Sequence, residues 1–185
     1  MKFVRIIQLV MMLPLMLVAI GYTLPPSSHA ESEIVIHAEP KSIYSFLNTP
    51  GNHPLWAPWV YNPQQPAELE ISGSAEGKGA KLYWRNTDNG LLSDKITNGE
   101  TTITSSIPYK FLTGDLVFNN VPTASYKFTI YNNKANTQAR ILFQYQSLEK
   151  GPMNRLSAAM FGNDIKSELD MSLNRLKSIA ETVSD

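Results

Sequence analysis

The sequence predicts an α+β fold in which a curved antiparallel sheet covers one long C-terminal helix, and three observations lead to it. Apolar and polar residues alternate along residues 126–130 and 139–145, as in antiparallel strands with one dry and one wet face. Near the C-terminus, apolar residues recur every three or four positions, which indicates an amphipathic helix. Turn signals separate the apolar runs in between, so one sheet and one helix account for the domain.

The chain opens with an apolar segment, residues 6–24, that carries no charge in 19 positions. As a helix it would be about 28 Å long, close to the ~30 Å hydrocarbon thickness of a bilayer. A cleavable signal peptide usually has a shorter apolar region, although the small-x-small motif ending at Ala30 is an acceptable cleavage site. We predict a transmembrane anchor or signal peptide over residues 1–30, with a retained anchor preferred, and one domain over residues 31–185. Both alternatives place that domain on the extracytoplasmic side, at a membrane or, after cleavage at Ala30, secreted or periplasmic.

The first elements of the domain precede a proline-rich stretch. Residues 32–38, SEIVIHA, have the β-branched centre of a strand. Pro40 suits the first position of a helix, and apolar residues at helical spacing follow over residues 43–47. Residues 48–66 then contain five prolines and no periodicity, and LWAPW in their middle holds two of the chain's three tryptophans.

The middle of the chain predicts strands separated by turns. In AKLYWR, residues 80–85, Ala80, Leu82 and Trp84 alternate with other residues. Asp88-Asn89-Gly90 and Asn98-Gly99 are hairpin-turn signals, because Asn and Gly accept the positive φ that tight turns require. Further strands are expected at residues 91–97, 101–106, 111–118, 126–130 and 139–145.

The C-terminal region predicts a long helix preceded by a shorter one. Gly151-Pro152 and Gly162-Asn163-Asp164 punctuate the sequence, so a separate short helix is expected near residues 153–161. The apolar stripe of the long helix consists of Ile165, Leu169, Leu173, Leu176, Ala180 and Val183.

The composition excludes several classes of protein. With 43% hydrophobic and 17% charged residues the chain is typical of a globular protein. Lys2 and Arg5 lie in the N-terminal segment, so the rest carries 14 basic and 16 acidic residues, a net charge of −2 that argues against nucleic acid as a partner. The absence of cysteine removes disulfides, thiolate zinc sites and cysteine nucleophiles.

Several motifs, in this order along the chain, carry a family resemblance. LWAPW is similar to a W-S-P-W motif, GKGAKLYW to G-x-G-A-x-x-x-W, and GPMNRLSAAMFGNDIKSELDMSLNRLKSI to a closing helix. Together they resemble the SRPBCC superfamily with its START-like helix-grip fold, and within it the membrane-anchored branch labelled polyketide cyclase/dehydrase or lipid transport. Ala57, where the family usually has serine, and His53, where it often has tryptophan, depart from the pattern.

The resemblance implies about seven antiparallel strands wrapped around the C-terminal helix, with two short helices after the first strand. It also implies a largely apolar cavity between sheet and helix, of the kind that holds lipids, sterols or polyketides. The candidate cavity residues are aromatic or flexible apolar side chains, for which plain core packing is the competing interpretation. They are Trp56, Trp59, Tyr83, Trp84, Phe118, Tyr126, Phe128, Phe143, Tyr145, Met160 and Phe161.

Catalytic and metal-binding patterns have little support in the sequence, and no cofactor is expected. His37 alternates away from the apolar side of its strand, which predicts a surface or edge position. His53 is the best candidate base because it adjoins LWAPW, but a helix-capping or hydrogen-bonded loop histidine is the preferred interpretation. Asp115 lies in an apolar strand, where the alternation favours an outward direction. No serine elbow or paired histidine ligands are found.

Three functions remain open. The first is a carrier or sensor of a small hydrophobic, lipid- or polyketide-like ligand, tethered to the membrane through residues 6–24, and it is the preferred one. The second is a cyclase- or dehydratase-type enzyme that uses the same cavity and needs titratable groups with shifted pKa inside it. The third is a protein-interaction module without a ligand, which would have a filled interior and an exposed apolar patch.

Overall fold

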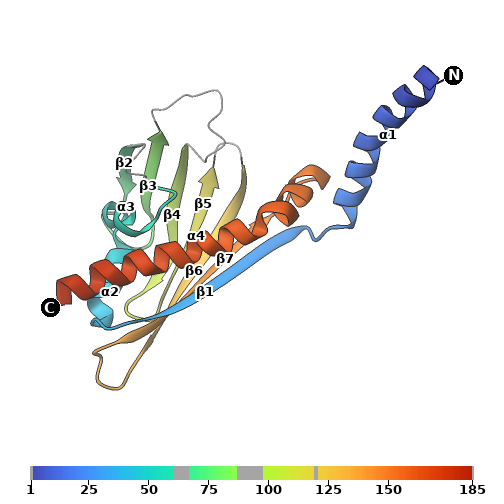
Figure 1. Ribbon diagram of the computed structural model, residues 1–185. Helices are drawn as coiled ribbons and strands as arrows, with labels where there is room; N and C mark the ends of the chain where they lie inside the picture. The colour runs from blue at the N-terminus through green and yellow to red at the C-terminus, as the bar shows by residue number, and fades with distance from the viewer. Residues whose placement is uncertain (1, 61–66, 87–97, 119–120, 185) are drawn as a thin grey trace.

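A computed structural model of the chain describes residues 2–60, 67–86, 98–118 and 121–184. In them a seven-stranded antiparallel sheet of order β1-β7-β6-β5-β4-β3-β2 lies against a long C-terminal helix, α4 (Figure 1). This architecture confirms the predicted α+β fold with a curved sheet and a C-terminal helix. The strands are β1 (Ser27–Ile36), β2 (Ala67–Gly73), β3 (Ala80–Asn86), β4 (Asn98–Ile107), β5 (Phe111–Phe118), β6 (Val121–Asn132) and β7 (Ala139–Leu148).

The helices lie at the two ends of the sequence and just after β1. α4 packs mainly against β1 and also contacts α1, α2 and α3 (Figure 1). The predicted pair of short helices after the first strand is therefore present, with one turn of 3₁₀ helix between them. The helices are α1 (Lys2–Thr23), α2 (Pro40–Asn48), η1 (Pro50–Asn52), α3 (His53–Trp56) and α4 (Pro152–Ser184).

The inner face of the sheet, which is the face toward these helices, carries the apolar side chains that alternation predicts. On β3, Leu82 and Trp84 are buried, and on β5 Leu112 and Leu116 are buried. Asp115 is exposed, so its predicted outward direction is confirmed. α4 closes the core with Leu169, Leu173, Leu176 and Ala180, all of them buried.

The N-terminal helix α1 is joined closely to the start of α4 and extends away from the sheet (Figure 1). A Cβ at Gly21 would collide with the backbone of Pro152, so only glycine permits this approach of the two helices. The backbone N–H of Glu149 donates to Pro26 O at 2.8 Å just below this contact. β1 begins at Ser27, five residues before the predicted strand, and its first residues pair with the end of β7.

Within the part of the chain that the structure describes, no helix is both long enough and apolar enough to cross a membrane. The assignment of residues 6–24 as an anchor, and with it the extracytoplasmic location, remains a prediction.

Two sequence predictions about local structure are wrong. Asn98-Gly99 does not form a turn but begins β4, where Gly99 pairs with Trp84 on one side and Phe118 on the other. Glycine is needed there for close approach, since a Cβ would collide with the Trp84 ring. The separate helix near residues 153–161 is part of the continuous α4, because a glycine inside a helix costs only about 1 kcal/mol and packing of the later turns outweighs it. The predicted turn at 88–90 and strand at 91–97 lie outside the described residues.

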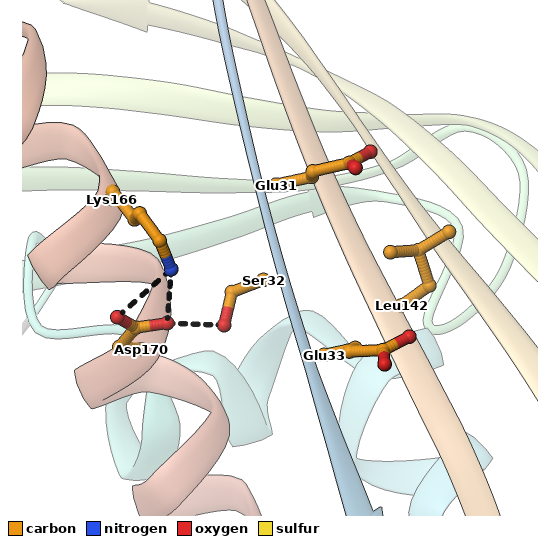
Figure 2. Close-up of a pocket in the computed structure, with 6 residues that line it drawn as sticks. All are labelled: Glu31, Ser32, Glu33, Leu142, Lys166 and Asp170. Atoms are coloured by element: carbon orange, nitrogen blue, oxygen red, sulfur yellow. Dashed lines mark hydrogen bonds and ion pairs between the residues drawn. The ribbon is translucent and has the colours of Figure 1, made fainter.

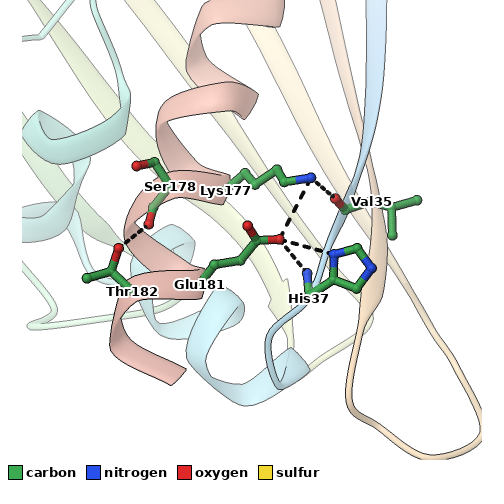
Figure 3. Close-up of polar contacts among 6 residues, drawn as sticks. All are labelled: Val35, His37, Lys177, Ser178, Glu181 and Thr182. Atoms are coloured by element: carbon green, nitrogen blue, oxygen red, sulfur yellow. Dashed lines mark hydrogen bonds and ion pairs between the residues drawn. The ribbon is translucent and has the colours of Figure 1, made fainter. Parts of the chain in front are cut away.

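The C-terminal end of α4 is fastened to β1 by polar contacts at the surface (Figure 3). The Glu181 carboxylate accepts the backbone N–H of His37 at 2.8 Å, and Lys177 donates to Val35 O at 3.1 Å. The His37 side chain is exposed, as its place in the strand predicts. The His37 N–H is the main reason that the pKa of Glu181 is lowered.

Candidate functional site

The inner face of the sheet holds a cluster of aromatic rings that touch one another. Phe128 and Phe143 on neighbouring strands are stacked with their ring centroids 4.0 Å apart. Trp56 meets Phe128 edge-on at 5.4 Å, and Trp59 lies 6.0 Å from Trp56. Tyr126 lies 5.9 Å from Phe128, also edge-on. Five of the predicted cavity residues are therefore brought together into one aromatic cluster.

LWAPW enters this cluster by way of α3, so its first residues are helical rather than irregular. Trp56 is 2% exposed, and its indole Nε1–H donates to Phe46 O in α2 at 3.0 Å. Trp59 is only partly buried and packs at the margin of the cluster, 6.1 Å from Phe143. Trp56 is thus fixed by α2, while Trp59 lies at the margin of the cluster.

His53 supports Trp56 from the outside. Its ring lies edge-on to Trp56 at 5.0 Å, and its Nε2–H donates to Leu47 O at 2.9 Å. Complete burial lowers the pKa of His53 to about 4, and the bond to Leu47 only partly opposes this effect. The imidazole is therefore neutral near pH 7, and its bonding nitrogen is already engaged by the backbone.

We call this group, Trp56 with His53, Phe128 and Phe143, the Trp56 half of the interior.

A second group of inner-face side chains lies toward β3 and β4. Trp84 is 1% exposed and meets Phe118 edge-on at 5.8 Å. Its ring lies over Gly99, and two positions along the same strand Thr101 Oγ1 is 3.0 Å from the Tyr126 hydroxyl. We call Trp84, Phe118, Gly99 and Thr101 the Trp84 half, and Tyr126 joins it to the aromatic cluster.

The polar atoms of the Trp84 half are neutral. Burial raises the pKa of Tyr126 to about 12, so its hydroxyl keeps its proton at ordinary pH. The indole Nε1 of Trp84 is buried and has no hydrogen-bond partner in the described structure. Since buried N–H groups are rarely left unpaired, this donor marks the Trp84 half as the place where a missing acceptor would fit.

The sheet edge next to the Trp84 half is only partly covered by the helical layer, which reaches it at Gly51 of η1 beside Ile71. Leu69 of β2 lies directly across from Trp84 and Ile71 across from Leu82, so both share the inner face. They are nevertheless 43% and 53% exposed. Exposed apolar side chains on the inner face of a sheet mark an open flank, in contrast to the closed flank beneath α4.

Other predicted site residues lie elsewhere or only at the margin. Tyr83 is on the outer face of β3 beside Arg85, whose guanidinium carbon is 5.9 Å from the ring centroid. Tyr145 is half-buried, and burial raises the pKa of its hydroxyl. Met160 on α4 is 68% exposed. Phe161 lies in α4, but its side chain is outside the described part of the structure.

A polar depression of about 280 Å³ lies between β1 and α4 (Figure 2). The Ser32 hydroxyl donates to Asp170, and Lys166 Nζ is 3.3 Å from both oxygens of the same carboxylate. The bond from Ser32 is the main cause of the lowered pKa of Asp170. The hydrogen bonds and the ion pair among Ser32, Lys166 and Asp170 already use these polar groups. We therefore interpret them as contacts that hold α4 against β1. Its lining consists of Glu31, Ser32, Glu33, Leu142, Lys166 and Asp170.

Sequence reasoning missed the polar members of the interior. Thr101 could have been found, since it alternates in phase with the buried Ile103. The open inner-face position of Leu69 and Ile71 depends on the pairing of β2 with β3, which no local pattern specifies. No cluster of three or more metal-ligating side chains occurs among the described residues.

Comparison with known proteins gives matches in structure alone. No family model matches the chain, and no curated protein matches it. The protein of unknown function SA2116 from Staphylococcus aureus has a TM-score of 0.63 and 13% identity, over 85% of this chain and 96% of that one. Norcoclaurine synthase from Thalictrum flavum, as a point mutant in complex with a transition-state analogue, has a TM-score of 0.63 and 12% identity, over 86% and 97%. Aha1 from Colwellia psychrerythraea, solved as a dimer, has a TM-score of 0.57 and 20% identity, over 83% and 96%.

The chain has the helix-grip fold. The matched structures are of the SRPBCC, polyketide cyclase-like type, so the predicted fold is confirmed by structures that share little sequence with the chain. At these identities the likeness concerns the fold alone.

Proposed function

We propose that the chain binds a small hydrophobic ligand on the inner face of its sheet and does so at the extracytoplasmic face of a membrane. The observation that carries the proposal is a neutral, aromatic inner face whose β2 flank is left open at Leu69 and Ile71. Ligand sites in proteins are mostly apolar and aromatic, with a few placed polar groups, and the inner face has this composition. The helix-grip neighbour norcoclaurine synthase, solved with a transition-state analogue, shows that a fold of this kind accommodates a small organic molecule.

The alternative of an acid–base enzyme receives less support from the same interior. A general acid or base works best when its pKa lies near the working pH. Burial moves the pKa of His53 down to about 4 and that of Tyr126 up to about 12, so both move away from neutrality. These shifts favour binding over proton transfer.

The proposed location requires that the N-terminal helix α1 is retained rather than cleaved. Three contacts support it: Gly21 against Pro152, Glu149 N–H to Pro26 O, and Arg155 to Leu24 O at 3.4 Å. Cleavage after Ala30 would also remove four residues of β1 that pair with β7. Membranes washed with carbonate should therefore retain the full-length chain. Release of a soluble product that begins at Glu31 would contradict this part of the proposal and leave ligand binding untouched.

The direct test of ligand binding is mass spectrometry of small molecules that copurify with the full chain from its native envelope. A stoichiometric lipid- or polyketide-like molecule is expected. The Trp59→Ala variant should bind that molecule more weakly by about 1–3 kcal/mol, because an indole at the rim loses its contact with the ligand. Tyr83→Ala is the matched control, since this aromatic residue lies on the outer face and its loss should leave the affinity unchanged. A chain that purifies empty and takes up no apolar probe would overturn the proposal in favour of an interaction module.

A further inference from the structure

The indole N–H of Trp84 is the polar group of the interior that the proposed function does not yet explain. It is buried without a partner, whereas the indole N–H of Trp56, in a side chain buried to the same extent, donates to Phe46 O at 3.0 Å. An indole is a donor only, so nothing but an acceptor can satisfy it. A buried donor without an acceptor is a cost to the folded chain that a ligand with an acceptor would remove.

The Val117 carbonyl oxygen lies beside the Trp84 ring at Gly99 but does not accept from its N–H, and the same strand as Gly99 also carries a hydroxyl. The Thr101 and Tyr126 hydroxyls are 3.0 Å apart, and whichever donates to the other leaves one O–H proton free for a further acceptor. Thr101 is two residues from Gly99, over which the Trp84 ring lies, so the Cα atoms of these two residues are about 7 Å apart along the strand. The interior therefore offers two neutral donors along one strand of an apolar face.

The charge of the acceptor is set by what surrounds it. Among the described buried residues of β3, β4, β5 and β6, none carries a charge, and the polar side-chain groups are the hydroxyls of Thr101 and Tyr126 and the indole N–H of Trp84. A carboxylate or phosphate placed there would lose its hydration without gaining a cation, which is costly. A ketone or ester carbonyl has an acceptor and no charge to desolvate.

The open flank provides the path to this donor. Leu69 lies across from Trp84 and is 43% exposed, so a change of its rotamer gives up little burial. Ile71 beside it is 53% exposed, which extends the apolar surface along β2. A ligand that lies on these two side chains reaches the Trp84 half without disturbing the Trp56 half.

We propose that the ligand of this chain is an apolar molecule with a neutral carbonyl, and that this carbonyl accepts a hydrogen bond from Trp84 Nε1 after entering along the β2 flank. The inference rests on the proposed function and specifies the class of ligand. The Thr101–Tyr126 hydroxyl pair is the second donor in reach of the same molecule.

The test compares two probes on the full chain. One is 2-octanone, and the other is 2-methyl-1-octene, in which a methylene group replaces the carbonyl oxygen and the shape is kept. The alkene leaves water more readily than the ketone, so the ratio of the two affinities is compared between two proteins. The ratio of ketone to alkene affinity should be about threefold to tenfold higher for the unchanged chain than for Trp84→Phe, which keeps a ring at the site and removes the N–H.

The indole N–H signals in a ¹⁵N-correlated NMR spectrum give a second readout with an internal control. The chain has three tryptophans, and Trp84→Phe identifies the Trp84 signal by its loss. That signal should move downfield with the ketone and not with the alkene, while the signal of Trp56, which is already bonded to Phe46, stays in place.

The outcomes distinguish the two claims, which are binding of an apolar ligand and the hydrogen bond from Trp84 to its carbonyl. If Trp84→Phe leaves the ratio of ketone to alkene affinity unchanged, the carbonyl site is overturned and apolar binding stands. If neither probe binds, the proposed function fails and the inference with it. If the Trp84→Phe variant does not fold, a downfield shift of one indole N–H signal of the unchanged chain with the ketone and not with the alkene still supports the site, and the absence of such a shift overturns it.

Discussion

Two tryptophans of this chain are buried to the same degree and yet have opposite surroundings. Trp56 is 2% exposed, its N–H is bonded to Phe46 O, and His53 and α2 close the structure around it. Trp84 is 1% exposed, its N–H has no partner in the described structure, and the strand beside it shows apolar side chains to solvent. Burial alone therefore does not distinguish a core residue from a site residue.

The difference follows from the position of the helices relative to the sheet. α4 packs on β1 and also contacts α2 and α3, and β2 is at the edge of the sheet opposite β1 (Figure 1). Side chains and backbone from two layers are in reach near Trp56, so its N–H finds Phe46 O and the His53 ring finds Leu47 O.

At the β2 edge the helical layer contributes Gly51 beside Ile71 and Asn48 O, which accepts the Gly77 N–H. No group there accepts from Trp84 Nε1 in the described structure, so this donor stays unpaired.

The largest expected effect concerns the closure of the Trp56 half and is a dependence of stability on pH. The pKa of His53 is lowered from 6.5 to about 4 in the folded chain by burial. Between these values the unfolded chain binds a proton that the folded chain does not, so stability falls as the pH drops from 6.5 toward 4. The loss should total about 3 kcal/mol, measured by denaturant unfolding at a series of pH values.

His53→Gln is the matched control, because it keeps a donor near Leu47 O and cannot titrate. It should flatten the pH profile above pH 4.5. The carboxyls with lowered pKa, Glu100, Asp170 and Glu181, act mainly below that value, since their ordinary values are 4.5, 3.8 and 4.5. An unchanged slope in the variant would mean that the Trp56 half is open to water.

A smaller loss of stability is expected from adding a methyl group where Gly99 contacts the Trp84 ring. In Gly99→Ala the new methyl group would collide with the Trp84 ring, so the strand or the ring must shift at a cost of about 2 kcal/mol. Gly51→Ala is the matched control, because its methyl group would meet only the flexible Ile71 Cδ1 at 3.4 Å. Thermal unfolding measures both.

The double variant Gly99→Ala with Trp84→Phe should recover part of that loss, since the smaller ring leaves room for the methyl group. Strict additivity of the two changes would show that Trp84 does not lie over Gly99 in solution.

These residues also show how far the sequence predicts the molecule. Alternation correctly places Trp84, Tyr126 and Phe128 on the inner face. Successive side chains of a strand point to opposite faces, so the sequence of the strand itself is enough to assign them. The same reasoning fails at Gly99: Asn-Gly is a turn signal only when nothing needs to approach that glycine, and a ring from the next strand does. Alternation also does not predict that the N–H of Trp84 is unpaired. Whether an acceptor is in reach depends on every element that packs around the ring, and the sequence of one strand does not contain that information.

Replacing each of the two tryptophans with phenylalanine in the ligand-free chain measures what each indole N–H contributes to stability. Both changes remove a similar buried area, so the loss of apolar burial is nearly the same in the two variants. Trp56→Phe also leaves Phe46 O without its donor, whereas Trp84→Phe removes a donor that had no acceptor. Trp56→Phe should therefore be the more destabilising by about 1–2 kcal/mol in urea unfolding. Equal losses would indicate that the Trp84 N–H finds a partner in solution.

The smallest expected effect comes from the surface fastening of α4, and it tests whether the Trp56 half depends on that fastening at all. In Glu181→Gln the side-chain oxygen still accepts the His37 N–H, while the pair with Lys177 at 3.8 Å loses its charge (Figure 3). Both side chains are about one-third exposed, so water screens the pair and the loss should stay below about 1 kcal/mol. Glu33→Gln, which breaks the 2.8 Å pair with Arg140 on the outer face, is the matched control and should cost as little. A loss of several kcal/mol in Glu181→Gln alone would show that the grip of α4 depends on its C-terminal polar contacts rather than on Leu169, Leu173 and Leu176. The Trp56 half would then be only conditionally closed, and its difference from the Trp84 half would be one of degree.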